Sequence, residues 1–347
     1  MKKFWLFLFS LFLGFALFFW VAKNVGWLEI KKALLVFTGW QGLVILLLTV
    51  LMALLGSWKW KEIIRGLGAE IPFWSLCRIY LAGFSVRFLA PVVIIGAEIF
   101  QGKILKDKNN IPWPKSMASI IIDRIMEWTT NLVVVFFGTL FFLLAIGWPP
   151  LTVAILGGAV LLILAILLAF FYLKYFKNES IADEFLKLFG KNLRQPLEIE
   201  QELFNFFTFS NKKLWQSLGI SFLRALVIYI RTWFLVFFLG KNIGLLPTLS
   251  VLGFYHLAMI LPIPTALGIH EALQTFAFGS LGLAAATAAA FAMLTRAAEL
   301  ILALAGLIIL FRLSMELAVG NFLKNFRKLF IRKDKYLEIK NGDIIKQ

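Results

Sequence analysis

Long apolar runs constrain the fold of this chain more than any other feature of its sequence. Six of them approach or exceed the about 20 residues that an α-helix needs to cross a bilayer, and they cover residues 4–22, 40–58, 116–147, 151–173, 214–240 and 283–313. Hydrophobic residues make up 61% of the chain and charged residues 16%, whereas a soluble domain carries about 25% charged residues. We therefore predict an all-α polytopic membrane protein with about six full transmembrane helices.

Two further apolar stretches, 74–104 and 246–281, contain Pro and Gly near their middles. Each half spans about 13 residues, or about 20 Å of helix, which is shorter than the hydrocarbon core of about 30 Å. Such breaks are tolerated inside protein or beside a water-filled cavity, so we predict two re-entrant helical hairpins. The predicted hinge residues are Pro91, Gly96, Pro262, Pro264 and Gly268.

The basic residues predict the orientation in the membrane. With the N-terminus in the cytoplasm, 26 of the 35 Lys and Arg residues fall in predicted cytoplasmic segments and 4 in outer loops. This asymmetry follows the positive-inside rule, so we predict a multi-pass protein of the cytoplasmic membrane with both termini in the cytoplasm. Because these residues lie in short loops beside apolar spans, the net charge of +16 indicates anionic lipids rather than nucleic acid as partners.

Residues 1–347 are predicted to form a single membrane domain with two halves, 1–173 and 214–313. In the polar connection 174–213, Leu203, Phe206 and Phe207 recur at helical spacing. This pattern predicts amphipathic helices on the cytoplasmic membrane surface, with a solvated linker as the alternative. Residues 314–347 form a basic cytoplasmic tail that is too short for a catalytic domain.

The two broken stretches and the spans that follow them carry matching polar residues. In each copy Glu precedes Gln by three residues, and Arg precedes Glu by three. The first copy contains Glu98, Gln101, Arg124 and Glu127, and the second contains Glu271, Gln274, Arg296 and Glu299. Because three predicted crossings separate the copies, they enter the membrane from opposite sides. The pattern therefore predicts an inverted-topology repeat, an architecture common in transporters.

Ten charged residues lie inside apolar segments, where each costs about 2.5–3.5 kcal/mol at a helix centre. They are Glu98, Asp123, Glu127, Glu271, Glu299, Arg87, Arg124, Arg224, Arg231 and Arg296. Residues of this kind pair with one another or line a hydrated cavity. Structural ion pairs, such as Arg124 with Glu127 at i,i+3, are one interpretation. A translocation site for an anionic headgroup is the other.

Some of these residues favour the translocation site. Arg224 and Arg231 are seven residues apart on one helix that contains no acid, so they form a cationic face suited to a phosphate. His270 adjoins Glu271 and could couple transport to protons. The sequence around them, HEALQ, lacks the second His of a zinc-protease motif, and Cys77 is the single cysteine. We therefore predict no metal site and no cofactor.

With these residues assembled, the chain resembles the family of flippase-like membrane proteins related to the transmembrane half of lysyl-phosphatidylglycerol synthases. The resemblance rests on Leu89-Ala-Pro through Gly-Ala-Glu98, on Ala118 through Asp123-Arg124, and on Pro262-Ile-Pro through Gly-Ile-His-Glu271. It implies a flippase fold with two re-entrant elements and translocation of lipids between leaflets. Synthase activity is not carried over. The chain departs from the family pattern, in which a second Gly precedes the Glu and an Arg follows shortly after it: those places hold Ala97 and either Gln101 or Lys103.

The predicted function is therefore a flippase or transporter, and not an enzyme. Its predicted substrate is an anionic or aminoacylated phospholipid, or a polyprenyl-phosphate-linked lipid. One alternative is an intramembrane enzyme that acts on a lipid-linked substrate. The other is a non-transporting scaffold for a separate lipid-modifying enzyme. The repeat is compatible with a homodimer.

Overall fold

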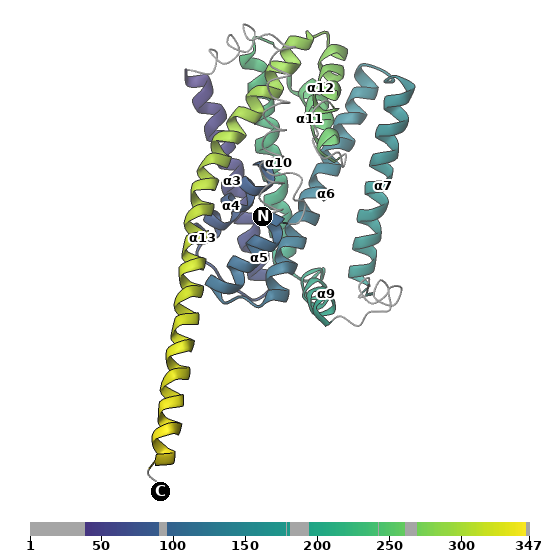
Figure 1. The fold of residues 1–347 in the computed structure, drawn as a ribbon. Helices are drawn as coiled ribbons and strands as arrows, with labels where there is room; N and C mark the ends of the chain where they lie inside the picture. Colours follow the sequence, from purple (N-terminus) through teal and green to yellow (C-terminus); the bar gives the residue numbers. More distant parts are fainter. Residues whose placement is uncertain are drawn as a thin grey trace.

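The computed structural model describes residues 39–89, 96–177, 179–180, 194–241, 243–260 and 269–344. Within these ranges the chain forms ten α-helices and no strand (Figure 1). The helices are α3 (Trp40–Gly66), α4 (Phe73–Leu89), α5 (Gly96–Asn109), α6 (Trp113–Ala145), α7 (Leu151–Phe176), α9 (Arg194–Phe206), α10 (Lys212–Phe238), α11 (Leu245–Ile260), α12 (Ile269–Ser280) and α13 (Ala285–Ile344).

Five of these helices, α3, α6, α7, α10 and α13, are long and apolar enough to cross a membrane. They correspond to five of the six predicted spans, and the first predicted span, 4–22, lies outside the described residues. Two boundaries differ from the prediction. Helix α3 continues to Gly66, eight residues past the predicted end, and α13 continues as one helix to Ile344 through most of the predicted tail.

Each of the two broken stretches forms two short helices. Helices α4 and α5 flank residues 90–95, and α11 and α12 flank residues 261–268. With 17, 14, 16 and 12 residues, these helices are each shorter than a span. Of the predicted hinge residues, Gly96 is the first residue of α5. Pro91, Pro262, Pro264 and Gly268 lie outside the described residues.

The helices of the two halves pack in a matching pattern. Helix α3 packs along α10, α4 packs on α13, and α11 packs on α6. Helix α5 contacts α4 and α6, just as α12 contacts α11 and α13. Helices α5 and α12 lie toward opposite ends of the bundle (Figure 1). Each pair of short helices therefore contacts the long helix that follows it and the long helix of the other half.

Helix α9 is amphipathic, as predicted, and buries its apolar face against protein. Leu203, Phe206 and Phe207 are at most 4% exposed. They join the core that α3, α4 and α6 form, and Phe207 contacts the rings of Phe171 and Tyr175 on α7. The predicted surface helix thus packs under the bundle because aromatic side chains from α7 cover its apolar stripe.

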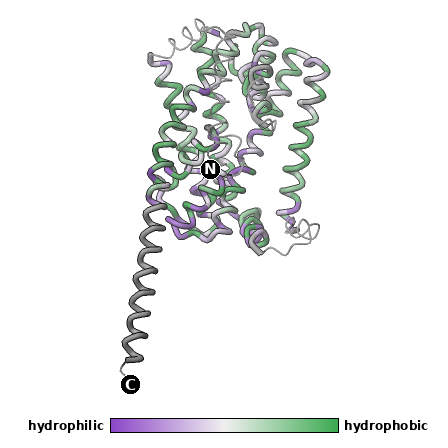
Figure 2. Tube along the Cα trace, in the orientation of Figure 1, coloured by the Kyte–Doolittle hydropathy of each residue, from purple (hydrophilic) through white to green (hydrophobic). Residues whose placement is uncertain are grey.

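Helix α7 exposes most of its apolar side chains. Large residues such as Leu162, Ile166 and Phe170 are about half exposed, and Figure 2 shows hydrophobic residues along the whole helix. In a membrane these side chains face lipid, which dissolves them as well as a protein core does.

Glycines allow the closest helix crossings in both halves. A Cβ atom at Gly138 on α6 would lie 2.6 Å from the carbonyl oxygen of Leu249 and 2.9 Å from Cα of Gly253 on α11. A Cβ at Gly306 on α13 would clash with Leu81 and Ser85 on α4. Small residues permit such close approach of membrane helices.

We expect Gly138→Ala and Gly306→Ala each to lower the free energy of unfolding by about 1–3 kcal/mol, because the added methyl group forces the helices apart. Thermal unfolding in detergent measures the effect. Gly158→Ala on α7 is the control, since a Cβ there has no atom within 4 Å. It should raise stability slightly through helix propensity. Equal effects at all three positions would contradict the packing argument.

Candidate functional site: two buried charge clusters

A lysine that the sequence analysis placed in a cytoplasmic loop lies inside the bundle. Lys59 is 1% exposed, and its Nζ is 2.8 Å from Oδ1 of Asp123 and donates to the Asp123 carbonyl oxygen at 3.1 Å. The predicted end of the second span at residue 58 is therefore wrong, because α3 continues to Gly66. Helix α3 continues past Trp58 with its charged side chains partnered: Lys59 pairs with Asp123 on α6, and Glu62 pairs with Lys213 on α10.

Glu127 on α6 bridges two arginines. Its Oε2 lies 2.5 Å from Nη1 of Arg124, the predicted i,i+3 pair, and its Oε1 lies 2.7 Å from Nη1 of Arg224 on α10. Arg124 also contacts Oδ2 of Asp123 at 3.3 Å. Arg224 is the thirteenth of the 27 residues of α10, so the bridge lies near the middle of that span.

The first pair of short helices adds three of the predicted residues. Nη1 of Arg87, in the last turn of α4, lies 3.7 Å from Oε1 of Glu98 and donates to Oε1 of Gln101 at 3.3 Å. Glu98 lies in the first turn of α5, where a helix N-terminus favours a carboxylate. We call the charged residues of this half the first charge cluster; Lys59 and Asp123 are buried, and the side chains of the others are 15–25% exposed. Its members are Lys59, Arg87, Glu98, Asp123, Arg124, Glu127 and Arg224.

The second half contains a smaller set, the second charge cluster, made of Arg231, Arg296 and Glu299. Arg231 is 2% exposed, and its Nη2 lies 3.0 Å from Oε1 of Glu299 on α13. Its Nη1 donates to Oγ1 of Thr49 on α3 at 3.4 Å. Arg296 lies on α13 one turn before Glu299, and both interact electrostatically with Tyr255. The two clusters are neighbours because Arg224 of the first and Arg231 of the second lie on α10, seven residues or about 10 Å apart along the helix.

The two predicted glutamines make equivalent contacts. Nε2 of Gln101 on α5 donates to the carbonyl oxygen of Ile79 on α4 at 3.4 Å. Nε2 of Gln274 on α12 donates to the carbonyl oxygen of Val251 on α11 at 3.4 Å. Both amides are at most 2% exposed. Each pair of short helices is therefore joined by a glutamine at the same relative position.

His270 and Glu271 are the second and third residues of α12, so they occupy its first turn as Glu98 does in α5. Their backbone is described, and their side chains are not. Among the described residues, no group of three or more His, Cys, Asp or Glu side chains could hold a metal ion.

The charges of the first charge cluster do not cancel. In the first charge cluster four cations face three carboxylates, so the described charges sum to one positive. Nε of Arg124, Arg224 and Arg231 is buried and has no hydrogen-bond partner among the described residues. A guanidinium donates in a fork that matches phosphate and carboxylate oxygens. The clusters therefore retain donors for an anionic group after their own ion pairs have formed.

Sequence reasoning found most of these residues but not all their partners. It counted five arginines against five acids and missed Lys59, which is the sixth cation of the two clusters. It also found no acid for Arg224 and Arg231 on their own helix. The structure supplies Glu127 from α6 and Glu299 from α13. An anionic ligand would have to share these arginines with the carboxylates.

Comparisons with known proteins agree with this membrane architecture. The family model for the lysylphosphatidylglycerol synthase TM region matches residues 7–306. The chain belongs to this family. The resemblance predicted from the motifs is thereby confirmed, and membership of the lysylphosphatidylglycerol synthase TM region family associates this multi-pass membrane protein with lipid metabolism.

Two curated relatives are UPF0104 membrane proteins. One, from Methanocaldococcus jannaschii, is 21% identical over 267 residues, which are 74% of this chain and 79% of the relative. The other, from Pyrococcus horikoshii, is 25% identical over 277 residues, which are 72% of this chain and 81% of the relative. No solved structure gives a significant match.

Proposed function

We propose that this chain translocates an amphipathic lipid between the leaflets of the cytoplasmic membrane. The single observation that carries the proposal is the presence of two charge clusters at neighbouring depths of one bundle. Ionisable groups within membrane spans are rare and mark substrate and ion pathways. The arginine donors left without a protein acceptor suit the phosphate of a lipid headgroup.

We further propose that the two halves form an inverted-topology repeat with two re-entrant hairpins. Three observations support this: the matching helix contacts, the equivalent contacts of Gln101 and Gln274, and the position of α5 and α12 toward opposite ends of the bundle. In such folds substrate binds where broken helices meet near the midplane. Glu98 and Glu271 would there contact the polar or cationic part of the headgroup, or control its access.

The charge asymmetry of the loops supports an orientation with both termini in the cytoplasm. In this orientation the ends of α3 and α5 and the start of α10 face the cytoplasm. The substrate would be an anionic or aminoacylated phospholipid, or a polyprenyl-phosphate-linked lipid. Because the proposed activity returns the lipid chemically unchanged, the chain would act as a transporter and not as an enzyme.

A leaflet-accessibility assay in proteoliposomes tests the proposal. Headgroup-labelled anionic, aminoacylated and polyprenyl-phosphate lipids are reconstituted separately, and the fraction open to an external quencher is followed with time. We expect the protein to accelerate the movement of one of these lipid classes between the leaflets. Glu98→Gln and Glu271→Gln should reduce the rate to that of empty liposomes, because both residues sit at the N-terminal turns of the short helices.

Glu198→Gln is the matched control, because this carboxylate on α9 is exposed and lies outside both clusters and outside every pocket wall described below. Its rate should equal that of the wild type. Mass spectrometry of the recovered lipid separates transport from chemistry, since an altered product would identify an intramembrane enzyme instead. If no lipid class moves faster than in empty liposomes, or if both Glu variants remain fully active, the proposed translocation site is wrong.

A further inference from the structure

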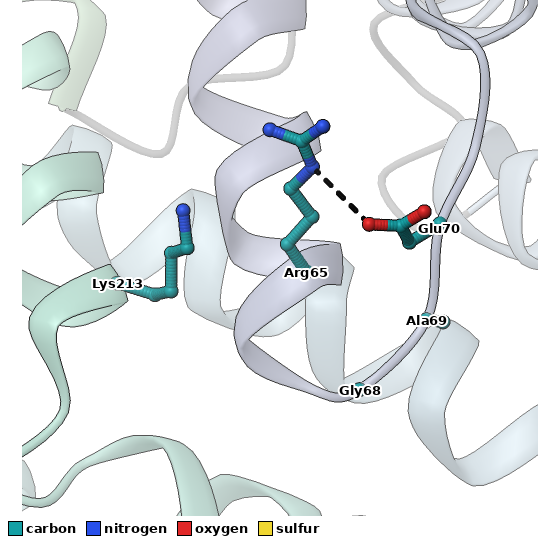
Figure 3. A pocket seen from close by; sticks show the side chains of 5 residues that line it. All are labelled: Arg65, Gly68, Ala69, Glu70 and Lys213. Atoms are coloured by element: carbon teal, nitrogen blue, oxygen red, sulfur yellow. Dashed lines mark ion pairs between the residues drawn. The ribbon is translucent and has the colours of Figure 1, made fainter.

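A pocket lies outside the charge clusters, at the end of the bundle where α3 finishes and α10 begins. Its volume is about 450 Å³, and its walls are Arg65, Gly68, Ala69, Glu70 and Lys213 (Figure 3). Arg65 comes from the last turn of α3, and Lys213 comes from the first turn of α10. The other three residues belong to the connection between α3 and α4. The backbone at this turn is left-handed at Gly68, where φ is 75°.

The two cations of the pocket are held in place by one buried carboxylate. Glu62, whose side chain is 8% exposed, accepts from Nη1 of Arg65 at 3.0 Å and from Nζ of Lys213. Nζ of Lys213 also donates to Oε1 of Gln216 at 2.9 Å. Both cationic groups are therefore positioned at the pocket wall before any ligand arrives, which lowers the entropy lost on binding.

A third cation lies next to Gly68 of the pocket wall, although it does not itself line the pocket. Nζ of Lys115 on α6 donates to the carbonyl oxygen of Leu67 at 2.8 Å and would be 3.7 Å from a Cβ at Gly68. Glu70 is the acid of the wall; its side chain is 87% exposed, and its carboxylate points toward Arg65, at 4.0 Å from Nε (Figure 3). Three cations thus stand against two carboxylates, both of which already pair with Arg65, and one positive charge remains in excess. The N-terminus of α10 adds the positive end of its dipole.

The surroundings place this pocket at the level of lipid headgroups. Trp74 in the first turn of α4 is 67% exposed, and Trp215, two residues after Lys213, is 52% exposed. Nε1 of Trp215 donates to the carbonyl oxygen of Phe209, which is exposed as well. Exposed Trp at the ends of spans marks the membrane–water interface. Lys59 of the first charge cluster lies six residues deeper along α3, or about 9 Å.

We propose that this pocket binds a phosphate group. Arginine and lysine side chains fixed by a common carboxylate, beside a helix N-terminus, form a site for phosphate oxygens, and a volume of this size holds a phosphorylated headgroup. The phosphate would come from a membrane phospholipid whose acyl chains extend past Trp74 and Trp215, or from free phosphate in the cytoplasm. This proposal does not depend on the proposed translocation, since binding is measured without transport.

Titration calorimetry on the delipidated full chain in a non-ionic detergent tests the site, with dihexanoyl-phosphatidylglycerol and inorganic phosphate as separate probes. We expect Arg65→Gln and Lys213→Gln each to weaken binding by about tenfold or more, because each removes charged donors. Each single variant leaves Glu62 with its other cation, so the fold is preserved. Ala69→Leu fills the pocket, leaves every charge in place and should weaken binding similarly.

Lys212→Gln is the matched control. It removes the same charge one residue away, from an exposed side chain that does not line the pocket, and should leave binding unchanged. Tighter binding of the lipid than of inorganic phosphate assigns the site to a headgroup, and equal binding assigns it to phosphate itself. Failure of both probes to bind overturns the proposal. The proposal is also overturned if Lys212→Gln weakens binding as much as Arg65→Gln does, because general attraction to positive charge would then explain the result.

Discussion

Replacing Lys59 with methionine is expected to lower the free energy of unfolding by about 3 kcal/mol or more, since removing one partner of a buried ion pair leaves the other charge uncompensated. Lys59 and Asp123 are 1% and 4% exposed, and their charged atoms lie 2.8 Å apart. Arg124 remains near Asp123 at 3.3 Å, but it already pairs with Glu127. Chemical unfolding of the detergent-solubilised protein measures the loss.

The double variant Lys59→Met/Asp123→Leu is expected to recover most of this stability. Replacing both members of a buried pair with apolar residues of similar volume is often neutral or stabilising. Lys61→Met is the control, because Lys61 is only partly buried and contacts the ring of Phe73 rather than a carboxylate. A single Lys59 variant as stable as the wild type would mean that Lys59 is not buried in a pair.

Lys59 also shows where sequence reasoning stops. Hydropathy predicted the end of the span at Trp58, because the next residues are Lys59, Trp60, Lys61 and Glu62. Hydropathy treats each charge as solvated. In the fold Lys59 pairs with Asp123, and Glu62 pairs with Lys213, which lies 151 positions later in the sequence. Partners so distant in sequence cannot be read from the local pattern of α3.

Local patterns succeeded where the physics is local. Apolar length predicted five spans that the described residues contain. The spacing of Arg124 and Glu127 predicted an ion pair on one helix face, and that pair is present. The sequence also placed Gly96 at a break between two short helices, and α5 begins there. These outcomes depend on residues within one helical turn or within one apolar run.

Long-range pairing could not be predicted in the same way. Arg224 and Arg231 share a face of α10, which suggested one cationic surface, yet their carboxylates come from two different helices. Only the packing of α10 between α6 and α13 brings Glu127 and Glu299 to them. The equivalent contacts of Gln101 and Gln274 likewise require each short helix to lie against its partner.

Replacing both members of the second buried pair should separate folding from transport. We expect Arg231→Met/Glu299→Leu to remain folded, because it removes both charges at once and leaves Thr49 bonded to the carbonyl oxygen of Ile45. Either single variant should lose about 3–5 kcal/mol of stability. If the proposed function is right, the folded double variant moves no lipid. Apolar side chains can replace this ion pair in the folded structure, but they cannot bind a charged headgroup.

Lys108→Met/Glu316→Leu is the matched comparison for this experiment. That variant also removes an ion pair without changing the net charge, but its pair joins α5 to α13 and its glutamate side chain is 64% exposed. It should fold and transport as the wild type does, because exposed pairs contribute about 0–1 kcal/mol. Transport at the wild-type rate by the Arg231/Glu299 double variant would make that pair a structural one. The lipid path would then have to pass through the first charge cluster alone, where Arg124 and Arg224 retain their free Nε donors.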